Sequence, residues 1–126
     1  MNLDAENQLP AEINLPVLPL RGETLFPISD SVHSFVVGRE KSVAAIEEAL
    51  SKDRRILVIG QQDPELEAVV LSDLYEIGTE ASIVRMLKLP DGTTSVLVEG
   101  EHRVRAINTI SEQPFLRVVG WTIEDL

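Results

Sequence analysis

Four consecutive apolar residues, Ile56 to Ile59, constrain the fold of this chain more than any other feature. The run contains no polar side chain that could face water, and Gly60 ends it. Short unbroken apolar runs of this kind are typical of a β-strand buried on both faces. The segment therefore predicts a strand with apolar cover on either side.

Two further strands are expected before this run. Residues 13–20 are extended, but Pro16 and Pro19 lack backbone donors, so they allow an edge strand at best. Residues 32–37 predict a second strand that ends at Gly38.

Residues 39–53 predict the one helix of the chain. Apolar side chains recur every three or four positions on one face, at Val43, Ile46, Ala49 and Leu50. Glu48 and Lys52 lie one turn apart and are expected to form an ion pair.

The sequence after Gly60 predicts an exposed acidic loop over residues 61–73, followed only by strands. Gly92 allows a tight reversal, and Gly100 is expected to break the chain between two strands. The strands are predicted over residues 80–89, 94–99, 103–110 and 115–123. The last strand is expected to carry one apolar side, formed by Phe115, Val119, Trp121 and Ile123. The fold class is therefore mainly β with one α-helix, as a small β-barrel or a rolled antiparallel sheet.

Charge and composition exclude several classes of function. The chain has 126 residues, 21 acidic against 11 basic, and a formal net charge of −10. Such a charge repels a phosphate backbone, so nucleic acid is an unlikely partner. No apolar run is long enough to span a bilayer, no secretory signal precedes the domain, and cysteine is absent. We expect a cytoplasmic protein without a membrane partner.

No catalytic or metal-binding constellation is found in the sequence. The two histidines, His33 and His102, stand beside no serine in a recognisable motif, and Ser51-Lys52 is only a neighbour pair at a helix end. The seven glycines are scattered singly, so they form no phosphate-binding loop. The acidic residues of the 61–73 loop lack the pattern of a calcium site. We expect no enzymatic activity, no catalytic residues, no metal and no cofactor in this chain.

Five apolar residues lie beside turns or on the less regular face of their strands, and they are the candidate substrate-binding residues. If clustered and exposed, they form a binding patch; the alternative is that they close the ends of the barrel. They are Phe26, Leu71, Leu74, Met86 and Leu87.

Several motifs, taken in order along residues 13–123, resemble the N-terminal domain of the ATP-dependent Lon protease family. They are the proline-rich entry Leu15–Arg21, Phe26-Pro27, the segment Val37–Ser42, the hairpin Lys88–Thr93 and the segment Val96–Gly100. The chain departs from the family at Ser34, where a proline is common, and in a slightly longer spacing between Pro27 and Gly38.

The resemblance implies a PUA-like β-barrel at residues 13–124, as a fragment of a longer chain. Residues 1–12 are polar and lack a periodic apolar pattern, so they are expected to form a flexible tail. It implies a domain that binds unfolded, damaged or regulatory protein substrates and supports assembly of a cytoplasmic homohexamer. ATP, Mg²⁺ and the Ser–Lys dyad of a serine endopeptidase belong to modules that these residues lack, since neither a Walker motif nor such a dyad is present. The alternatives are a stand-alone PUA-like domain that acts as an oligomerisation scaffold or as an RNA-binding module. The RNA alternative depends on a basic patch formed by Arg85, Lys88, Arg103 and Arg105.

Overall fold

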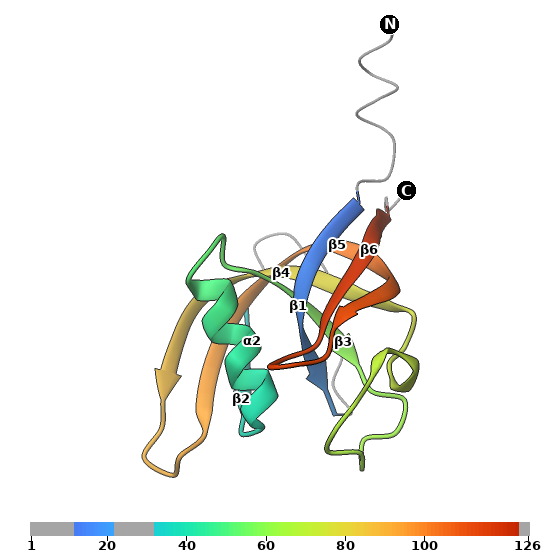
Figure 1. The fold of residues 1–126 in the computed structure, drawn as a ribbon. Helices are drawn as coiled ribbons and strands as arrows, with labels where there is room; N and C mark the ends of the chain where they lie inside the picture. The colour runs from blue at the N-terminus through green and yellow to red at the C-terminus, as the bar shows by residue number, and fades with distance from the viewer. Residues whose placement is uncertain (1–11, 22–31, 124–126) are drawn as a thin grey trace, which may run out of the picture.

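The computed structural model describes residues 12–21 and 32–123, and Figure 1 shows their arrangement. Apart from Glu12, the predicted tail lies outside the described residues, as do Phe26 and Pro27. The elements are β1 (Glu12–Leu20), β2 (Val32–Val37), α2 (Glu40–Leu50), β3 (Arg55–Gly60), the short 3-10 helix η1 (Leu71–Asp73), β4 (Ile77–Lys88), β5 (Thr94–Ser111) and β6 (Arg117–Ile123).

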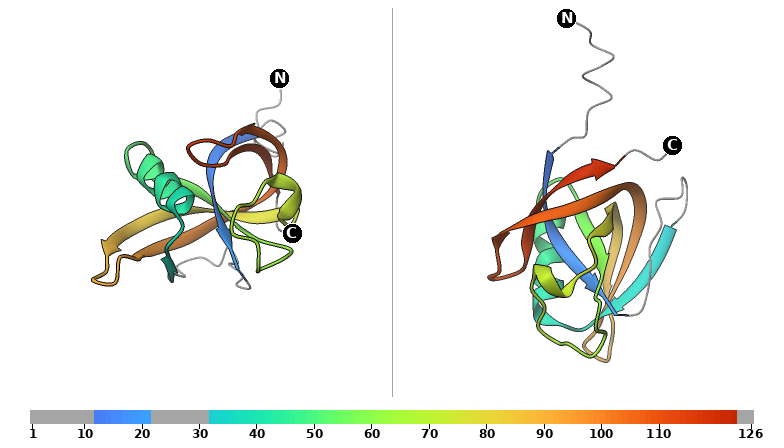
Figure 2. Two further views of the ribbon diagram at one scale, coloured as in Figure 1. Left: turned by 60° about the horizontal axis from the view of Figure 1, so that its bottom comes forward. Right: turned by 90° about the vertical axis from the view of Figure 1, so that its right-hand side faces the viewer.

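The six strands form one sheet in the order β2-β5-β4-β3-β1-β6, and a further pairing of β5 with β6 closes it into a ring. Every pairing is antiparallel except that of β1 with β3. Figure 2 shows how the long strand β5 curves, so that its first half lies beside β2 and its second half beside β6. The predicted fold class, mainly β with a helix and a rolled sheet, is confirmed.

Two hydrophobic clusters lie on opposite sides of β1 and β3. In β3, Ile56 and Val58 face the first cluster, whereas Leu57 and Ile59 face the second. Because successive side chains of a strand point to opposite faces, a strand between two cores must be apolar at every position. The first cluster also contains Leu18, Leu20, Phe35, Val37, Ala45, Ile46, Ala49, Ala81, Ile83, Val96, Val98 and Phe115. The second also contains Leu15, Val17, Leu74, Val104, Leu116 and Val118.

The prediction that residues 13–20 form an edge strand is wrong, because β1 lies between β3 and β6. Its first half pairs with β6 up to Pro16, and its second half pairs with β3 from Val17 to Leu20. Each half of β1 therefore forms its backbone hydrogen bonds mainly with one neighbouring strand, and its other edge is largely unpaired within the described residues. This explains how Pro16 and Pro19, which lack a backbone donor, are tolerated inside the sheet.

The predicted break at Gly100 is also wrong, since β5 runs without interruption from Thr94 to Ser111. Gly100 pairs with Ala81, and the next pairing joins His102 to Glu80, so Glu101 is the extra residue of a β-bulge. A bulge bends the strand while pairing continues on both sides. The glycine therefore marks a bend within one strand.

Helix α2, which Figure 1 shows alongside the sheet, packs into the first cluster. It ends at Leu50, three residues before the predicted end, and a turn follows. Its buried face carries Ser42, Ala45, Ile46 and Ala49, whereas Val43 and Leu50 are only partly buried. The predicted ion pair is confirmed, with 3.3 Å between Lys52 Nζ and Glu48 Oε2.

The predicted apolar side of the last strand is wrong. Val118 and Gly120 are the buried residues of β6, and Trp121 is 42% exposed. A Cβ atom on Gly120 would lie 2.6 Å from the backbone oxygen of Arg105 and 2.8 Å from Val104 Cγ1. Only glycine therefore fits where β6 crosses β5 at the second cluster.

Replacing Gly120 by alanine is expected to lower the free energy of unfolding by about 1–3 kcal/mol, because the added methyl group overpacks the strand contact. Urea denaturation followed by circular dichroism measures this change. Gly38→Ala is the matched control: its Cβ atom would lie 3.7 Å from Thr93 Cγ2, an ordinary contact. Equal stability of the two variants would contradict the assigned packing.

Candidate substrate-binding cavity

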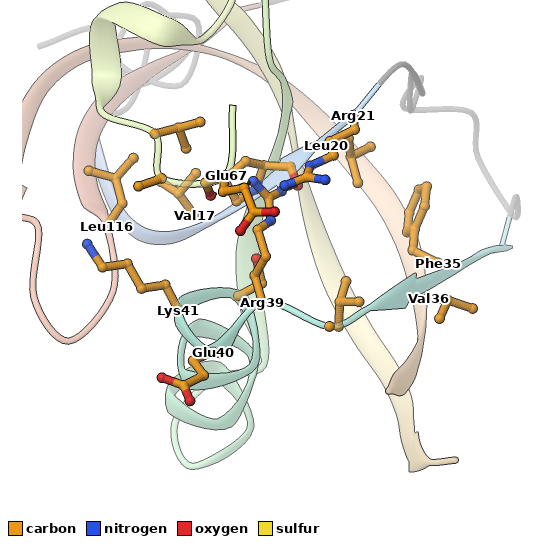
Figure 3. Close-up of a pocket in the computed structure, with 16 residues that line it drawn as sticks. Val17, Leu20, Arg21, Phe35, Val36, Arg39, Glu40, Lys41, Glu67 and Leu116 are labelled. Atoms are coloured by element: carbon orange, nitrogen blue, oxygen red, sulfur yellow. Dashed lines mark hydrogen bonds between the residues drawn. The ribbon is translucent and has the colours of Figure 1, made fainter. Parts of the chain in front are cut away.

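A cavity of about 790 Å³ opens where β1 ends and α2 begins. Strands β1 and β2, the first residues of α2 and the segment 67–69 surround it, and Figure 3 shows its lining. The cavity lies over the seam between the two hydrophobic clusters, because its apolar lining comes from both.

The apolar lining forms two walls. The second cluster contributes Val17 and Leu116, and the first contributes Leu20 and Phe35. Val36 lies at the rim of the cavity, where it is 65% exposed, and its side chain points to the face of β2 opposite to Phe35 and Val37. An apolar surface that is already concave and open to solvent favours the binding of apolar side chains.

Arg39 stands between these walls and joins three parts of the chain (Figure 3). Its Nη2 donates to the Pro19 oxygen of β1 at 2.9 Å, and its Nη1 donates to Gln61 Oε1 at 2.5 Å. A further bond from Nη1 reaches the backbone oxygen of Glu67 at 3.2 Å. The residue that precedes α2 therefore holds the end of β1 and the acidic loop together.

Gln61 extends this network into the acidic loop, and it is 3% exposed. Its Nε2 donates to the backbone oxygens of Asp63 and Leu66, both at 3.0 Å. Its own backbone N–H donates to the Leu20 oxygen at 2.8 Å. A buried amide with these partners costs little to desolvate, and it fixes the shape of the loop that borders the cavity.

The electrostatics of the cavity centre on Arg39. Burial lowers the pKa of its guanidinium, the charge of nearby Arg21 lowers it further, and the Glu67 carboxylate acts in the opposite direction. Arginine nevertheless stays protonated in proteins. Within the described residues no carboxylate lies in ion-pairing distance of Arg39, so a positive charge remains at the centre of the cavity.

Most of the residues that line the cavity are apolar, and its charged side chains are three basic and two acidic. No histidine is found among the described residues that line the cavity, and its one hydroxyl side chain, Ser42, is buried. In the part of the chain that the structure describes, no group of three acidic or histidine side chains is placed to hold a metal ion. Helices long and apolar enough to cross a membrane are likewise missing from residues 12–21 and 32–123.

The structure does not bring the four described candidate residues together. Leu74 is 3% exposed and belongs to the second cluster, against which Leu71 packs. Met86 packs against the first cluster, and only Leu87, at 59%, is clearly exposed. None of the four lines the cavity, and the fifth, Phe26, lies outside the described residues.

Sequence reasoning missed the role of Gln61, although a signal was present. The residue follows Leu57 and Ile59 at the same spacing of two, which places it on the face of β3 that is buried in the second cluster. The predicted loop contains the short helix η1, and its acidic side chains stabilise turns. Asp63 Oδ1 accepts a bond from the Glu65 N–H, and Asp73 Oδ2 accepts one from the Val70 N–H.

Two of the four basic residues considered for an RNA-binding patch, Arg103 and Arg105, have interaction partners. Arg105 forms an ion pair with Glu76 at 2.9 Å, and Arg103 also has an interaction partner. Arg55 binds both Glu80, at 3.0 Å, and Glu101. Arg105 and Arg55 thus pair with acidic neighbours.

Replacing Gln61 by leucine is expected to loosen the acidic loop. The substitution removes the donor to the carbonyls of Asp63 and Leu66 and the acceptor of Arg39 Nη1, and each lost hydrogen bond costs about 0.5–1.5 kcal/mol. Amide hydrogen exchange should become faster in residues 62–70, while the central residues of β4 keep their protection. Unchanged exchange in the loop would show that Gln61 does not hold it.

Comparison with known proteins gives a consistent result. The model of the ATP-dependent protease La (LON) substrate-binding domain matches residues 14–125. Lon protease 2 of Herpetosiphon aurantiacus is 46% identical over 112 residues, which are 89% of this chain and 14% of that protein. The Lon protease of Escherichia coli K12 is 44% identical over 100 residues, 79% of this chain and 12% of that protein. The chain thus spans about one-seventh of the length of these curated relatives or less.

Two solved structures share the fold. The N-terminal domain of the Mycobacterium avium complex Lon protease aligns with a TM-score of 0.66 at 18% identity, covering 90% of this chain and 55% of that one. A Lon N-terminal domain protein from Xanthomonas campestris aligns with a TM-score of 0.61 at 18% identity, covering 88% of this chain and 59% of that one. The chain therefore belongs to the Lon substrate-binding domain family.

Proposed function

We propose that this domain binds unfolded or damaged polypeptides for an ATP-dependent protease of which it forms one part. The family to which the chain belongs is described as a substrate-binding domain, and its relatives are named Lon proteases. In this proposal, ATP and Mg²⁺ binding and peptide-bond hydrolysis by a Ser–Lys dyad take place in other modules of the cytoplasmic protein.

The open cavity at the seam of the two clusters is the observation that supports this proposal best. Unfolded proteins differ from folded ones in exposing apolar side chains. The cavity offers such side chains two apolar walls and a volume of about 790 Å³. Burial of apolar area there supplies the driving force, at about 25 cal/mol per Å² removed from water.

We extend the proposed client surface to Leu87, one of the residues selected from the sequence. Val36 and Leu87 pair with Ser95 from opposite sides, so the three residues lie in one row across β2, β5 and β4. Residues directly opposite each other in antiparallel strands share a face of the sheet. The row therefore lies on the exposed face of the sheet and meets the rim of the cavity at Val36.

A single domain of this kind is expected to bind weakly, because an unfolded client loses conformational entropy when it is ordered. Several copies held in a homohexamer would retain the same client through effective concentration. We therefore include support of hexamer assembly in the proposal.

Val36→Ser is expected to weaken client binding by about three- to tenfold, because it removes two exposed methyl groups from the rim of the cavity. Titration of the ¹⁵N-labelled chain with reduced, carboxymethylated lactalbumin, a permanently unfolded protein, measures the dissociation constant. Chemical-shift changes should concentrate at the cavity lining.

Val84→Ser is the matched control for this experiment. Val84 is 46% exposed on β4 and does not line the cavity. The proposal expects little effect from this variant. A wild-type titration without shift changes, or equal losses in both variants, would rule out the cavity as the client site.

The assembly part of the proposal predicts self-association of the chain. Size-exclusion chromatography with light scattering should show a mean mass that rises with protein concentration. A strict monomer at the highest soluble concentration would remove assembly from the functions of this segment.

A further inference from the structure

The charge of the cavity differs in sign from that of the whole chain. Among its lining residues Arg21, Arg39 and Lys41 are basic, whereas Glu40 and Glu67 are acidic. The formal count is +1 (three basic minus two acidic), although the chain carries −10. Because the Debye length is about 8 Å at physiological ionic strength, nearby groups dominate the potential that a bound client meets.

Arg39 has unused hydrogen-bonding capacity. A guanidinium has five N–H donors, and three of them bind Gln61, Glu67 and Pro19. The Nε–H and one hydrogen of Nη2 have no acceptor within the described part of the chain. Arginine N–H groups bind carboxylates well because the charge strengthens each hydrogen bond.

The surroundings of Arg39 add to this positive character. Its pKa is lowered in part by Arg21, which shows that the two guanidinium groups are close enough to repel each other. Figure 3 shows the Lys41 side chain extended toward Leu116 and the Glu40 carboxylate directed away from Arg39. Arg39 also occupies the N-cap of α2 without a side-chain cap, so the positive end of the helix dipole adds to the same field.

We propose that the cavity selects polypeptide clients in which an acidic side chain is flanked by apolar residues, with the client carboxylate bound beside Arg39 and Arg21 and with Lys41 adding positive charge at the side of Leu116. This inference rests on the proposed polypeptide-binding function. Apolar side chains stand on both sides of Arg39, with Val17 and Leu116 on one side and Leu20 and Phe35 on the other, as Figure 3 shows. A carboxylate inside a segment lets the client make apolar contacts on both sides, whereas a C-terminal carboxylate leaves one wall empty.

Glu67 is expected to compete with such a client. Its charge raises the pKa of Arg39, so the carboxylate already stabilises that guanidinium from the loop. Glu67→Gln should therefore strengthen the binding of an acidic segment. This opposite effect from a neighbouring residue separates charge recognition from a general disturbance of the cavity.

Three peptides test the inference in titrations of the ¹⁵N-labelled 126-residue chain. The first is acetyl-Ser-Gly-Val-Leu-Glu-Leu-Val-Gly-Ser-amide, the second has Gln in place of Glu, and the third is the Gln peptide with a free C-terminal carboxylate. The Glu peptide is expected to bind about two- to fivefold more tightly than the Gln peptide, in the range of exposed ion pairs. The Nε–H resonance of Arg39 should shift with the Glu peptide only.

Variants assign this preference to the cavity. Arg21→Gln and Lys41→Gln should each reduce the preference for the Glu peptide, and Glu67→Gln should increase it. Lys88→Gln is the control, since Lys88 is an exposed base that does not line the cavity. Arg39 itself is left intact because its hydrogen bonds hold the cavity together.

The outcomes separate this inference from the proposed function. Equal affinities for the Glu and Gln peptides at the cavity would overturn the acidic preference while leaving polypeptide binding in place. If the Gln peptide with a free C-terminal carboxylate bound more tightly than the Glu peptide, the inference that the client carboxylate lies inside a segment would be overturned. Absence of binding by all three peptides and by unfolded lactalbumin would overturn both the inference and the proposed function.

Discussion

Burial of β1 and β3 on both faces is the constraint on which the rest of this structure depends. The two parallel strands separate the cluster under α2 from the cluster enclosed by β5 and β6. Neither cluster is complete without this shared wall, because each takes alternate side chains from it. Both clusters therefore require the apolar run Ile56–Ile59, and this shared requirement couples the folding of one cluster to that of the other.

The cavity follows from the way this wall ends. Beyond Leu20 the wall no longer separates the clusters, and apolar side chains from both sides meet at an opening to solvent. Arg39 and Gln61 bridge the opening through hydrogen bonds to Pro19 and to the acidic loop. A polar bridge of this kind keeps the apolar walls apart, which leaves a surface that a flexible client can cover.

Local sequence patterns predicted the elements whose structure depends on near neighbours. The strand Val32–Val37, the helix, the apolar strand Ile56–Ile59 and the turn at Gly92 were predicted close to their observed positions. The errors concern contacts between distant residues. Gly100 continues a strand because Ala81 pairs with it. Position 120 is a glycine because the backbone of Arg105 leaves no room there for a side chain.

The site was less predictable than the fold for the same reason. The hydrogen bonds that shape the cavity join Arg39 to Pro19 and Gln61, which are 20 and 22 positions away in the sequence. The periodicity of side chains within one helix or strand gives no information on such contacts. Exposed apolar residues near turns were a reasonable starting point. However, the side chains of Leu71, Leu74 and Met86 are needed by the two clusters.

Intermolecular nuclear Overhauser effects between methyl groups of this domain and an unfolded client test the central claim most directly. The account predicts effects from the methyl groups of Leu20, Val36 and Val69, which line the cavity, and none from Ile110, which is 48% exposed on the distant part of β5. Effects confined to methyl groups outside the cavity lining would contradict the assignment of this surface to client binding.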